Sequence, residues 1–215
     1  MRTRRVFVFA CLCLLAGYGA AFADQVVVPD GPPAFTDKQR DRLNRGEYVI
    51  DVQTRYLADG ILQGDGTGYI VIDATPEKIF SVILDFNRYA EYYPFVKTYS
   101  LYARAGNEYR VYSELSAFRI IHFAYHHRNR FDASAWQLTW DLDPERLSDF
   151  RLFDGYWKTW PRGDGRTLLA FVGRVRIEPG TRIPAFLAKL ASEYALRTVV
   201  THMKRRVESG GTYRP

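Results

Sequence analysis

The residues best suited to binding a metal ion are three histidines that lie close together, His122, His126 and His127. If they stand on a strand, His122 and His126 share a face but lie about 13 Å apart, at roughly 3.3 Å per residue. His126 and His127 then point to opposite faces. Ligands of one zinc ion must bring their nitrogens together, because each bond is only about 2.1 Å long. The spacing argues against a metal site and indicates ordinary surface histidines near a strand end.

Two other kinds of reactive site can be judged from short motifs. The chain has no Gly-x-Ser-x-Gly sequence, which is the usual setting of a hydrolase nucleophile. Gly64, Gly66 and Gly68 mimic part of a dinucleotide-binding loop. That loop follows a strand and opens a helix, so that backbone N–H groups meet phosphate. Here a strand follows the glycines, so we expect Gly60 and the Gly64-Asp65-Gly66 cluster to mark a turn between two strands.

General acid or base catalysis needs only one ionisable side chain whose pKa is shifted by burial. The candidates are Asp73, Glu114, Arg119 and Asp154. No two of them stand out as a pair, and a solvated charge on the outer face of a sheet is the simpler interpretation of each. The sequence therefore identifies no catalytic residue, no cofactor and no metal site, and it favours a binding protein over an enzyme.

The first 23 residues have the three parts of a secretory signal peptide. Arg2, Arg4 and Arg5 give a positively charged start, residues 6–16 are an uncharged apolar run, and Ala21-Phe22-Ala23 is a small-x-small cleavage pattern. The apolar run is shorter than the roughly 20 residues of a membrane-spanning helix. We therefore expect an exported protein, periplasmic in a Gram-negative organism and otherwise secreted.

Removal of this signal would leave no cysteine, because Cys11 and Cys13 both lie within it. Disulfides and thiol chemistry would then be excluded, and a packed core would have to supply the stability. The net charge would fall from +6 to +3, because three of the 30 basic residues are lost against 24 acidic ones. This balance, with its scattered basic residues, argues against a nucleic-acid partner.

Turn residues and hydrophobic spacing predict the order of the elements. The capping-box spacing of Thr36 and Gln39 predicts a helix to about Arg45, and Thr75-Pro76 and Asn87 predict two short helices ending before Pro94. Strands are expected at 48–56, 69–73, 96–104, 108–117, 119–131, 135–142, 150–161 and 166–178, in antiparallel hairpins. A long helix from 184 to about 207 has an apolar face of Leu187, Leu190, Ala191, Tyr194 and Thr198.

This order predicts an α+β protein in which a curved antiparallel sheet of about seven strands wraps around the long C-terminal helix. Two short helices follow the first of these strands, and an extra helix and strand precede it. The helix must bury its apolar stripe, and the concave face of the sheet is the only large apolar surface available. The expected division is a signal peptide at 1–23, an extension at 24–45, one folded domain at 46–207 and a disordered tail at 208–215.

Three stretches carry a family resemblance. They are Val71-Ile72-Asp73-Ala74-Thr75-Pro76-Glu77-Lys78-Ile79-Phe80, Asp85-Phe86-Asn87-Arg88-Tyr89 and Tyr93-Pro94-Phe95. Residues 64 to about 207 thus resemble the helix-grip (START-like, SRPBCC) superfamily, and most of all its polyketide cyclase and coenzyme Q-binding branch. The helix and strand at 36–57 and the export signal depart from the usual pattern. The resemblance implies a helix-grip fold with a deep, largely apolar cavity that binds a lipid, sterol, quinone or polyketide.

Strand alternation indicates which residues would face such a cavity. Ile121, Phe123 and Tyr125 fall on one face of their strand and His122 on the other. Tyr125, Trp157 and Tyr194 could each offer one hydrogen bond from an apolar body. The predicted ligand-binding residues are Ile83, Val111, Leu115, Ile121, Phe123, Tyr125, Trp136, Leu138, Trp157, Phe171, Leu187, Leu190 and Tyr194.

We therefore expect an exported, monomeric carrier that encloses a hydrophobic small molecule and makes transient contact with a membrane or a transporter. Transfer of the ligand out of water would contribute about 25 cal/mol per Å² of apolar surface. Two alternatives stay open. One is a cyclase- or dehydrase-like enzyme with a buried acid or base in the same cavity, and the other is an interaction module that pairs the edge strand at 48–56 with a partner.

Overall fold

A computed structural model describes residues 26–117, 121–177 and 184–215. Residues 1–23, predicted to be a signal peptide, and Arg119, named above as a candidate acid or base, lie outside these residues. The helices are α1 (Asp37–Asn44), α2 (Pro76–Ile83), the 3₁₀ helix η1 (Phe86–Arg88), α3 (Tyr89–Tyr92) and α4 (Ala185–Glu208). The strands are β1 (Val49–Tyr56), β2 (Leu62–Ile72), β3 (Val96–Ala105), β4 (Glu108–Ala117), β5 (Ile121–Asp132), β6 (Gln137–Leu142), β7 (Phe150–Pro161) and β8 (Thr167–Ile177).

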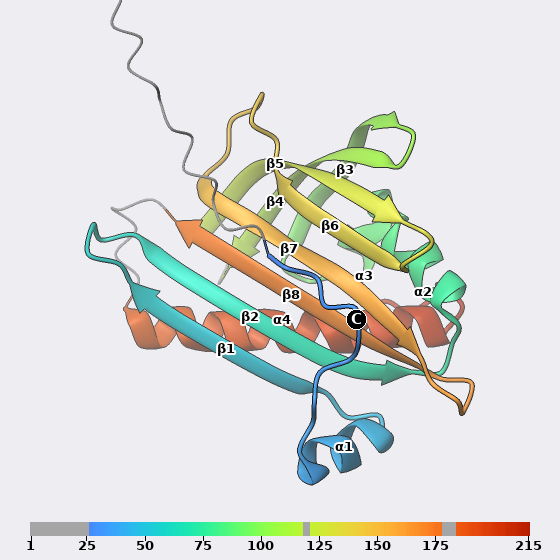
Figure 1. The fold of residues 1–215 in the computed structure, drawn as a ribbon. Helices are drawn as coiled ribbons and strands as arrows, with labels where there is room; N and C mark the ends of the chain where they lie inside the picture. Colours follow the sequence, from blue (N-terminus) through green and yellow to red (C-terminus); the bar gives the residue numbers. More distant parts are fainter. Residues whose placement is uncertain (1–25, 118–120, 178–183) are drawn as a thin grey trace, which may run out of the picture.

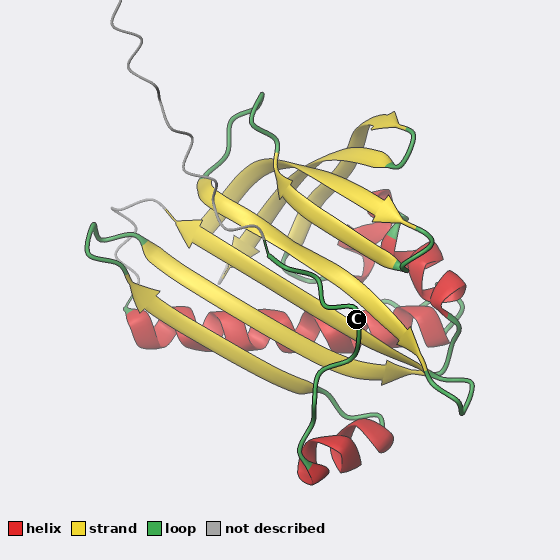
Figure 2. Cartoon of the chain, in the orientation of Figure 1, coloured by secondary structure: helices red, strands yellow, loops and turns green. Residues whose placement is uncertain are grey.

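The eight strands form one antiparallel sheet in the order β1-β2-β8-β7-β6-β5-β4-β3. The sheet curves, and α4 crosses one of its faces as a single long helix (Figures 1 and 2). This arrangement confirms the predicted fold class. The extra N-terminal strand is β1, which extends the sheet at one edge by pairing with β2. No helix of the described residues is long and apolar enough to cross a bilayer.

Strand β2 corrects the prediction made for the glycine cluster. Gly64 and Gly66 do not form a turn, because they lie inside an 11-residue strand that also contains Gly68. All three positions face α4. A Cβ atom at Gly68 would lie 2.9 Å from Cγ1 of Val200 and 3.1 Å from Cδ1 of Leu196. The missing side chains therefore let the helix pack directly on the strand. Of the predicted turn, only the part at Gly60 is confirmed, where φ is +81°.

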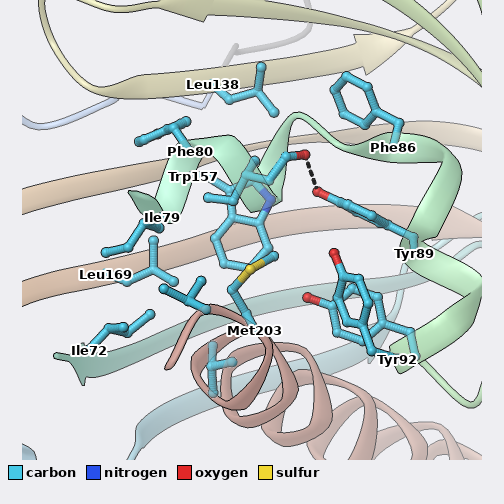
Figure 3. Close-up of a cluster of buried hydrophobic side chains, with 14 of the residues drawn as sticks. Ile72, Ile79, Phe80, Phe86, Tyr89, Tyr92, Leu138, Trp157, Leu169 and Met203 are labelled. Atoms are coloured by element: carbon cyan, nitrogen blue, oxygen red, sulfur yellow. Dashed lines mark hydrogen bonds between the residues drawn. The ribbon is translucent and has the colours of Figure 1, made fainter. Parts of the chain in front are cut away.

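The short helices close one end of the molecule. The Thr75 side chain caps α2 by accepting from the Lys78 N–H, and Pro76 occupies the first turn, as predicted. Asn87 does not cap a helix, because its side chain accepts a hydrogen bond from the Leu101 N–H on β3. Figure 3 shows how side chains from this corner, the sheet and α4 form one hydrophobic core. The labelled ones include Ile79, Phe80, Leu138, Trp157 and Met203.

In its N-terminal half, helix α4 buries a different face from the one predicted. Leu187, Leu190 and Tyr194 are exposed to 38%, 56% and 52%, whereas Thr198, the last residue of the predicted face, is buried as expected. The other buried residues of α4 are Ala188, Leu196, Val200, Met203, Arg206 and Val207. The helix approaches the glycine-rich strand closely, so small residues such as Ala188 and Ser192 fit beneath its N-terminal half and large apolar ones are turned outward. The positions of the large apolar residues therefore predicted the wrong buried face for the N-terminal half of α4.

The N-terminal extension covers the face of the sheet opposite to α4 (Figure 1). Phe35 packs edge-on against Tyr69, with ring centroids 5.1 Å apart, and the Trp160 indole N–H donates to the Asp30 carbonyl at 3.0 Å. A second, smaller hydrophobic cluster lies here. At the other terminus, the segment expected to be a disordered tail makes defined contacts. The Tyr213 ring packs against the core, and its carbonyl accepts from the buried Arg206.

Candidate functional site

A cavity of about 240 Å³ lies between the sheet and α4. One water needs only ~10–15 Å³ of such space, and an engineered apolar cavity of ~150 Å³ holds benzene. The cavity is therefore large enough for a small organic molecule. Helix α4 contributes Ser192, Ala195, Leu196 and Val199 to its wall. The aromatic residues of the wall are Phe86, Tyr89, Tyr93, Phe95, Tyr99, Tyr125, Trp140, Phe153, Trp157 and Phe171.

The aromatic wall is held in place by ring-to-ring packing. Phe171 lies edge-on to Trp157, with centroids 4.7 Å apart, and stacks on Trp140 at 5.2 Å. Trp140 also packs on Phe153 at 5.9 Å. The Tyr89 hydroxyl donates to the Ile83 carbonyl at 2.6 Å (Figure 3). Contacts of this kind fix the orientation of side chains that would otherwise collapse into the space, and they keep the cavity open.

Polar groups enter this wall from β3, β4 and β5. Tyr99 and Tyr125 line the cavity, and the buried Ser113 stands between them on β4. The Ser113 Oγ lies 3.1 Å from Nε2 of His127, which is 1% exposed. The Nδ2 of Asn129, another residue of the wall, lies 3.1 Å from Nδ1 of the same imidazole. A continuous polar chain therefore lies behind the apolar surface.

Residues 65–208 match the family model described as polyketide cyclase / dehydrase and lipid transport. This chain belongs to that family. The matched region begins inside β2 and ends with α4, so it contains nearly all of the sheet and the helix that covers the cavity. The extension and β1 lie outside it. A comparison with curated proteins finds no match.

Solved structures show the same fold at low identity. The protein TTHA0849 from Thermus thermophilus is 18% identical, with a TM-score of 0.59, over 69% of this chain and 99% of that one. The Zhui aromatase/cyclase from a Streptomyces species is 13% identical, with a TM-score of 0.56, over 70% and 99%. Human STARD10 is 12% identical, with a TM-score of 0.58, over 87% and 83%. Such identities establish the shared fold and leave the ligand open.

Only some of the predicted ligand-binding residues reach the cavity in this member of the polyketide cyclase and lipid-transport family. Those that line the cavity are Leu115, Tyr125, Leu138, Trp157 and Phe171. Ile83 and Val111 are fully buried in the core beside it. Leu187, Leu190 and Tyr194 are on the outside of α4, away from the wall. The side chain of Ile121 lies outside the described part of the structure.

Two further predicted residues pack elsewhere. Phe123 is not in the cavity wall, and its ring packs on Phe150 at a centroid distance of 4.9 Å, near the start of β5. Trp136 is in the turn before β6, with a φ of +48°, and not in the strand that was predicted. Its ring packs on Phe80 at 5.8 Å. A residue with a left-handed backbone conformation interrupts a strand, so the alternation of side chains along a strand does not apply to Trp136.

The buried imidazole corrects the interpretation of the histidines as surface residues. His122 is exposed, but His127 is enclosed by the rings of Tyr99, Tyr125 and Phe153. Burial lowers the pKa of His127 to about 3, so the ring is neutral at neutral pH. Alternation would have found it, because residues 125, 127 and 129 share one face of β5. No group of three potential metal ligands occurs among the described residues.

The direction of the hydrogen bonds excludes an activated serine. The Nδ2 of Asn129 also donates to the Tyr109 carbonyl, so it is the amide nitrogen that faces the imidazole. Nδ1 of His127 must then accept, and its proton is on Nε2, directed at Ser113. A histidine that already donates to a serine cannot remove that serine's proton. Ser113, His127 and Asn129 are therefore a hydrogen-bond relay rather than a nucleophilic triad.

The acid and base candidates lie away from the cavity interior. Asp154 is buried, but it pairs with Arg174, and alternation with Phe153 directs it to the opposite face of β7. Glu114 accepts hydrogen bonds from Tyr112 and Thr98, and the first of these lowers the pKa of its carboxyl. Asp73 is exposed. None of these three described carboxylates is directed into the cavity.

Proposed function

We propose that this protein is an exported carrier that encloses a hydrophobic small molecule between its sheet and α4. The observation that supports this most is the cavity, whose wall is aromatic and aliphatic over most of its surface. A lipid, sterol, quinone or similar molecule would leave water for this space at about 25 cal/mol per Å² of apolar surface. Membership of a family described as including lipid transport agrees with the proposal.

Export is the second part of the proposal, and it rests on residues 1–23. Their charged start, apolar run and Ala21-Phe22-Ala23 pattern are typical of a cleaved signal peptide. The remaining chain has no cysteine, which suits an oxidising compartment. A water-insoluble molecule outside the cytoplasmic membrane needs shelter, and a thiol-free protein with an apolar cavity provides it.

We include in the proposal a transient contact of a monomer with a membrane surface, made by the outer side of α4. Phe186 and Leu190 are exposed to 65% and 56%, on the helix that covers the cavity. Lys189 and Arg197 stand beside this apolar surface and would favour anionic lipid headgroups. Flotation with phosphatidylglycerol vesicles tests the contact. Substitution of both Phe186 and Leu190 by serine should weaken it, and unchanged flotation would argue against it.

An enzyme of the cyclase or dehydrase kind would need a buried acid or base directed at the ligand. Among the described wall residues the charged ones are Asp65 and Arg174, and strand alternation directs both to the outer face of the sheet. His127 is neutral and its accepting nitrogen is occupied by Asn129. The described part of the cavity is therefore better suited to holding a molecule than to proton transfer.

Native mass spectrometry of the exported protein tests the proposal. The protein is purified from the medium or periplasm without detergent, and organic extracts of it are compared with extracts of a Leu196→Trp variant that fills the space beneath α4. We expect a bound hydrophobic molecule in the natural protein and its loss in the variant. An empty protein that also binds no added lipid, sterol or quinone would refute the carrier function. Trp140 and Trp157 in the wall give a fluorescence signal for such additions.

A further inference from the structure

Three polar side chains form a straight row across neighbouring strands. Tyr99 on β3 is paired in register with Ser113 on β4, and Ser113 is paired with Tyr125 on β5. Residues directly opposite each other in antiparallel strands point to the same face, and their Cβ atoms lie about 5 Å apart. This face is the cavity wall, to which Tyr99 and Tyr125 both belong. The row is thus a polar stripe set into an aromatic surface.

The row is supported from one side by a second set of groups. His127 follows Tyr125 on the same face of β5, and its Nε2–H donates to the Ser113 oxygen at 3.1 Å. Asn129 holds the other imidazole nitrogen and is itself held by the Tyr109 carbonyl. Every donor hydrogen of the Asn129 amide and of the neutral imidazole is therefore used inside the relay, which fixes the Ser113 hydroxyl between the two phenols.

The phenols of the row carry more hydrogens than Ser113 can accept. Ser113 stands in register between Tyr99 and Tyr125, and its oxygen accepts from His127. At most one of the two phenols can therefore donate to the lone pair that remains on the Ser113 oxygen, and the other phenol keeps its own hydrogen. No other side-chain hydrogen bond of Tyr99 or Tyr125 occurs in the described part of the chain. At least one O–H donor is left for a ligand.

A second unused donor lies on the same wall. The indole nitrogen of Trp140 is buried and has no hydrogen-bond partner among the described residues. Trp140 is paired in register with Asn129, the last member of the relay. Buried donors without an acceptor are costly, at about 1–3 kcal/mol each, and are rare in proteins. The wall therefore carries more donor hydrogens than its own acceptors satisfy.

We propose that the Tyr99–Ser113–Tyr125 row docks a carbonyl oxygen, so that the ligand is a hydrophobic ketone or quinone rather than a plain hydrocarbon or a carboxylate. This inference rests on the carrier function proposed above and specifies its ligand class. A carbonyl oxygen only accepts, which matches a site that offers donor hydrogens. A carboxylate would need a positive charge, whereas burial raises the pKa of Tyr99 and Tyr125 and keeps both phenols as neutral donors.

A matched pair of probes tests the inference on the protein without its signal. The probes are 2-acetylnaphthalene and 2-ethylnaphthalene, which have similar size and differ in the carbonyl. Isothermal titration calorimetry gives the two dissociation constants and their ratio, for the natural protein and for Tyr99→Phe, Tyr125→Phe and the double variant. Tyr156→Phe is the control, because Tyr156 is a buried tyrosine of the cluster on the opposite face of the sheet.

We expect the double variant to lose about three- to tenfold in affinity for the ketone relative to the hydrocarbon, which corresponds to one hydrogen bond. Tyr156→Phe should keep the natural ratio. Unchanged binding of the hydrocarbon shows that the variants are folded and the cavity is intact. With a ¹³C-labelled carbonyl, the infrared stretching frequency of the bound ketone should rise when both hydroxyls are removed, a shift that a merely structural role would not produce.

The outcomes separate the two proposals. In one outcome the protein binds both probes, but the Tyr→Phe changes alter neither the ratio of dissociation constants nor the carbonyl frequency. This result would overturn the carbonyl site and would leave the carrier function standing. Binding of neither probe by the natural protein would count against both the apolar cavity and the row. Selective loss of ketone binding in the double variant alone supports the site. Ser113→Ala, which removes the hydroxyl that stands between the two phenols, should then change the ratio as well.

Discussion

Acidification should destabilise this protein through His127 in particular. The buried imidazole has a pKa of about 3 in the folded state, against about 6.5 when the chain is unfolded. Between these two values the unfolded chain binds the proton and the folded chain does not. The free energy of unfolding therefore falls as the pH falls from 6.5 toward 3, and the stability that His127 contributes is fully present only above about pH 6.5.

The size of the effect follows from linkage. In the middle of the window one proton separates the two states, which gives a slope of roughly 1.4 kcal/mol per pH unit. Between pH 7 and pH 5 the loss is about 2 kcal/mol, since the unfolded histidine is only partly protonated near its own pKa. That is a large share of the 5–15 kcal/mol by which domains are typically stable.

Urea denaturation at pH 7, 6 and 5 measures this loss. The natural protein is compared with His127→Gln, which keeps an amide donor and acceptor but cannot titrate, and with His122→Gln, which removes an exposed histidine from the same strand. His127→Gln should remove about 2 kcal/mol of the difference between pH 7 and pH 5, although it is less stable at pH 7. His122→Gln should not. If the imidazole signal of His127 titrates near pH 6.5 in NMR spectra, the buried neutral relay is refuted.

Three further predictions concern packing, and each is checked by urea denaturation unless stated. Gly68→Ala should lower the free energy of unfolding by about 1–3 kcal/mol, because the added Cβ would press on α4. Gly163→Ala is the control and should be near neutral, because a Cβ there meets nothing within 4 Å. Equal effects of the two substitutions would contradict the close contact between α4 and β2. Leu196→Ala should lower the free energy of unfolding by about 2–5 kcal/mol, and Leu190→Ser by less than about 0.5 kcal/mol, because only Leu196 is buried. If Leu190→Ser were the more damaging of the two, α4 would bury the face that carries Leu190. Trp160→Phe removes the hydrogen bond to Asp30 and should speed proteolysis of residues 26–35 without unfolding the sheet; an unchanged cleavage rate would show that the aromatic packing alone holds the extension.

Local signals were enough to predict most elements. The capping box of Thr36 and Gln39 and the Thr75-Pro76 start both appear in the structure, because a cap is a contact between residues three apart. The six strands after Pro94 were predicted to within two residues at each end, since turn residues separate nearly all of them. Signals of this kind depend on no distant part of the chain.

The errors came where a distant element decides the outcome. Gly64 and Gly66 have the composition of a turn, yet they form a strand because α4 needs bare backbone beneath it. The outward position of Leu190 has the same cause. Ile83 and Val111 are apolar as predicted, but the closed end of the cavity is filled by the α2 and α3 corner, so they became core. Sequence alternation identifies a face of the sheet and does not show how much of that face another element covers.

The polar row illustrates this limit most clearly, because it depends on the register of three strands. Tyr99 stands opposite Ser113 because one irregularity in β3, between Leu101 and Ala103, shifts its pairing with β4 by one residue relative to the turn that joins the two strands. A slip of one residue would send the Tyr99 side chain to the other face and separate it from the relay. The sequence shows tyrosines, a serine and a histidine at wide intervals. The pairing of β3, β4 and β5 brings these side chains together into one site, in which a phenol hydroxyl can still donate to a ligand.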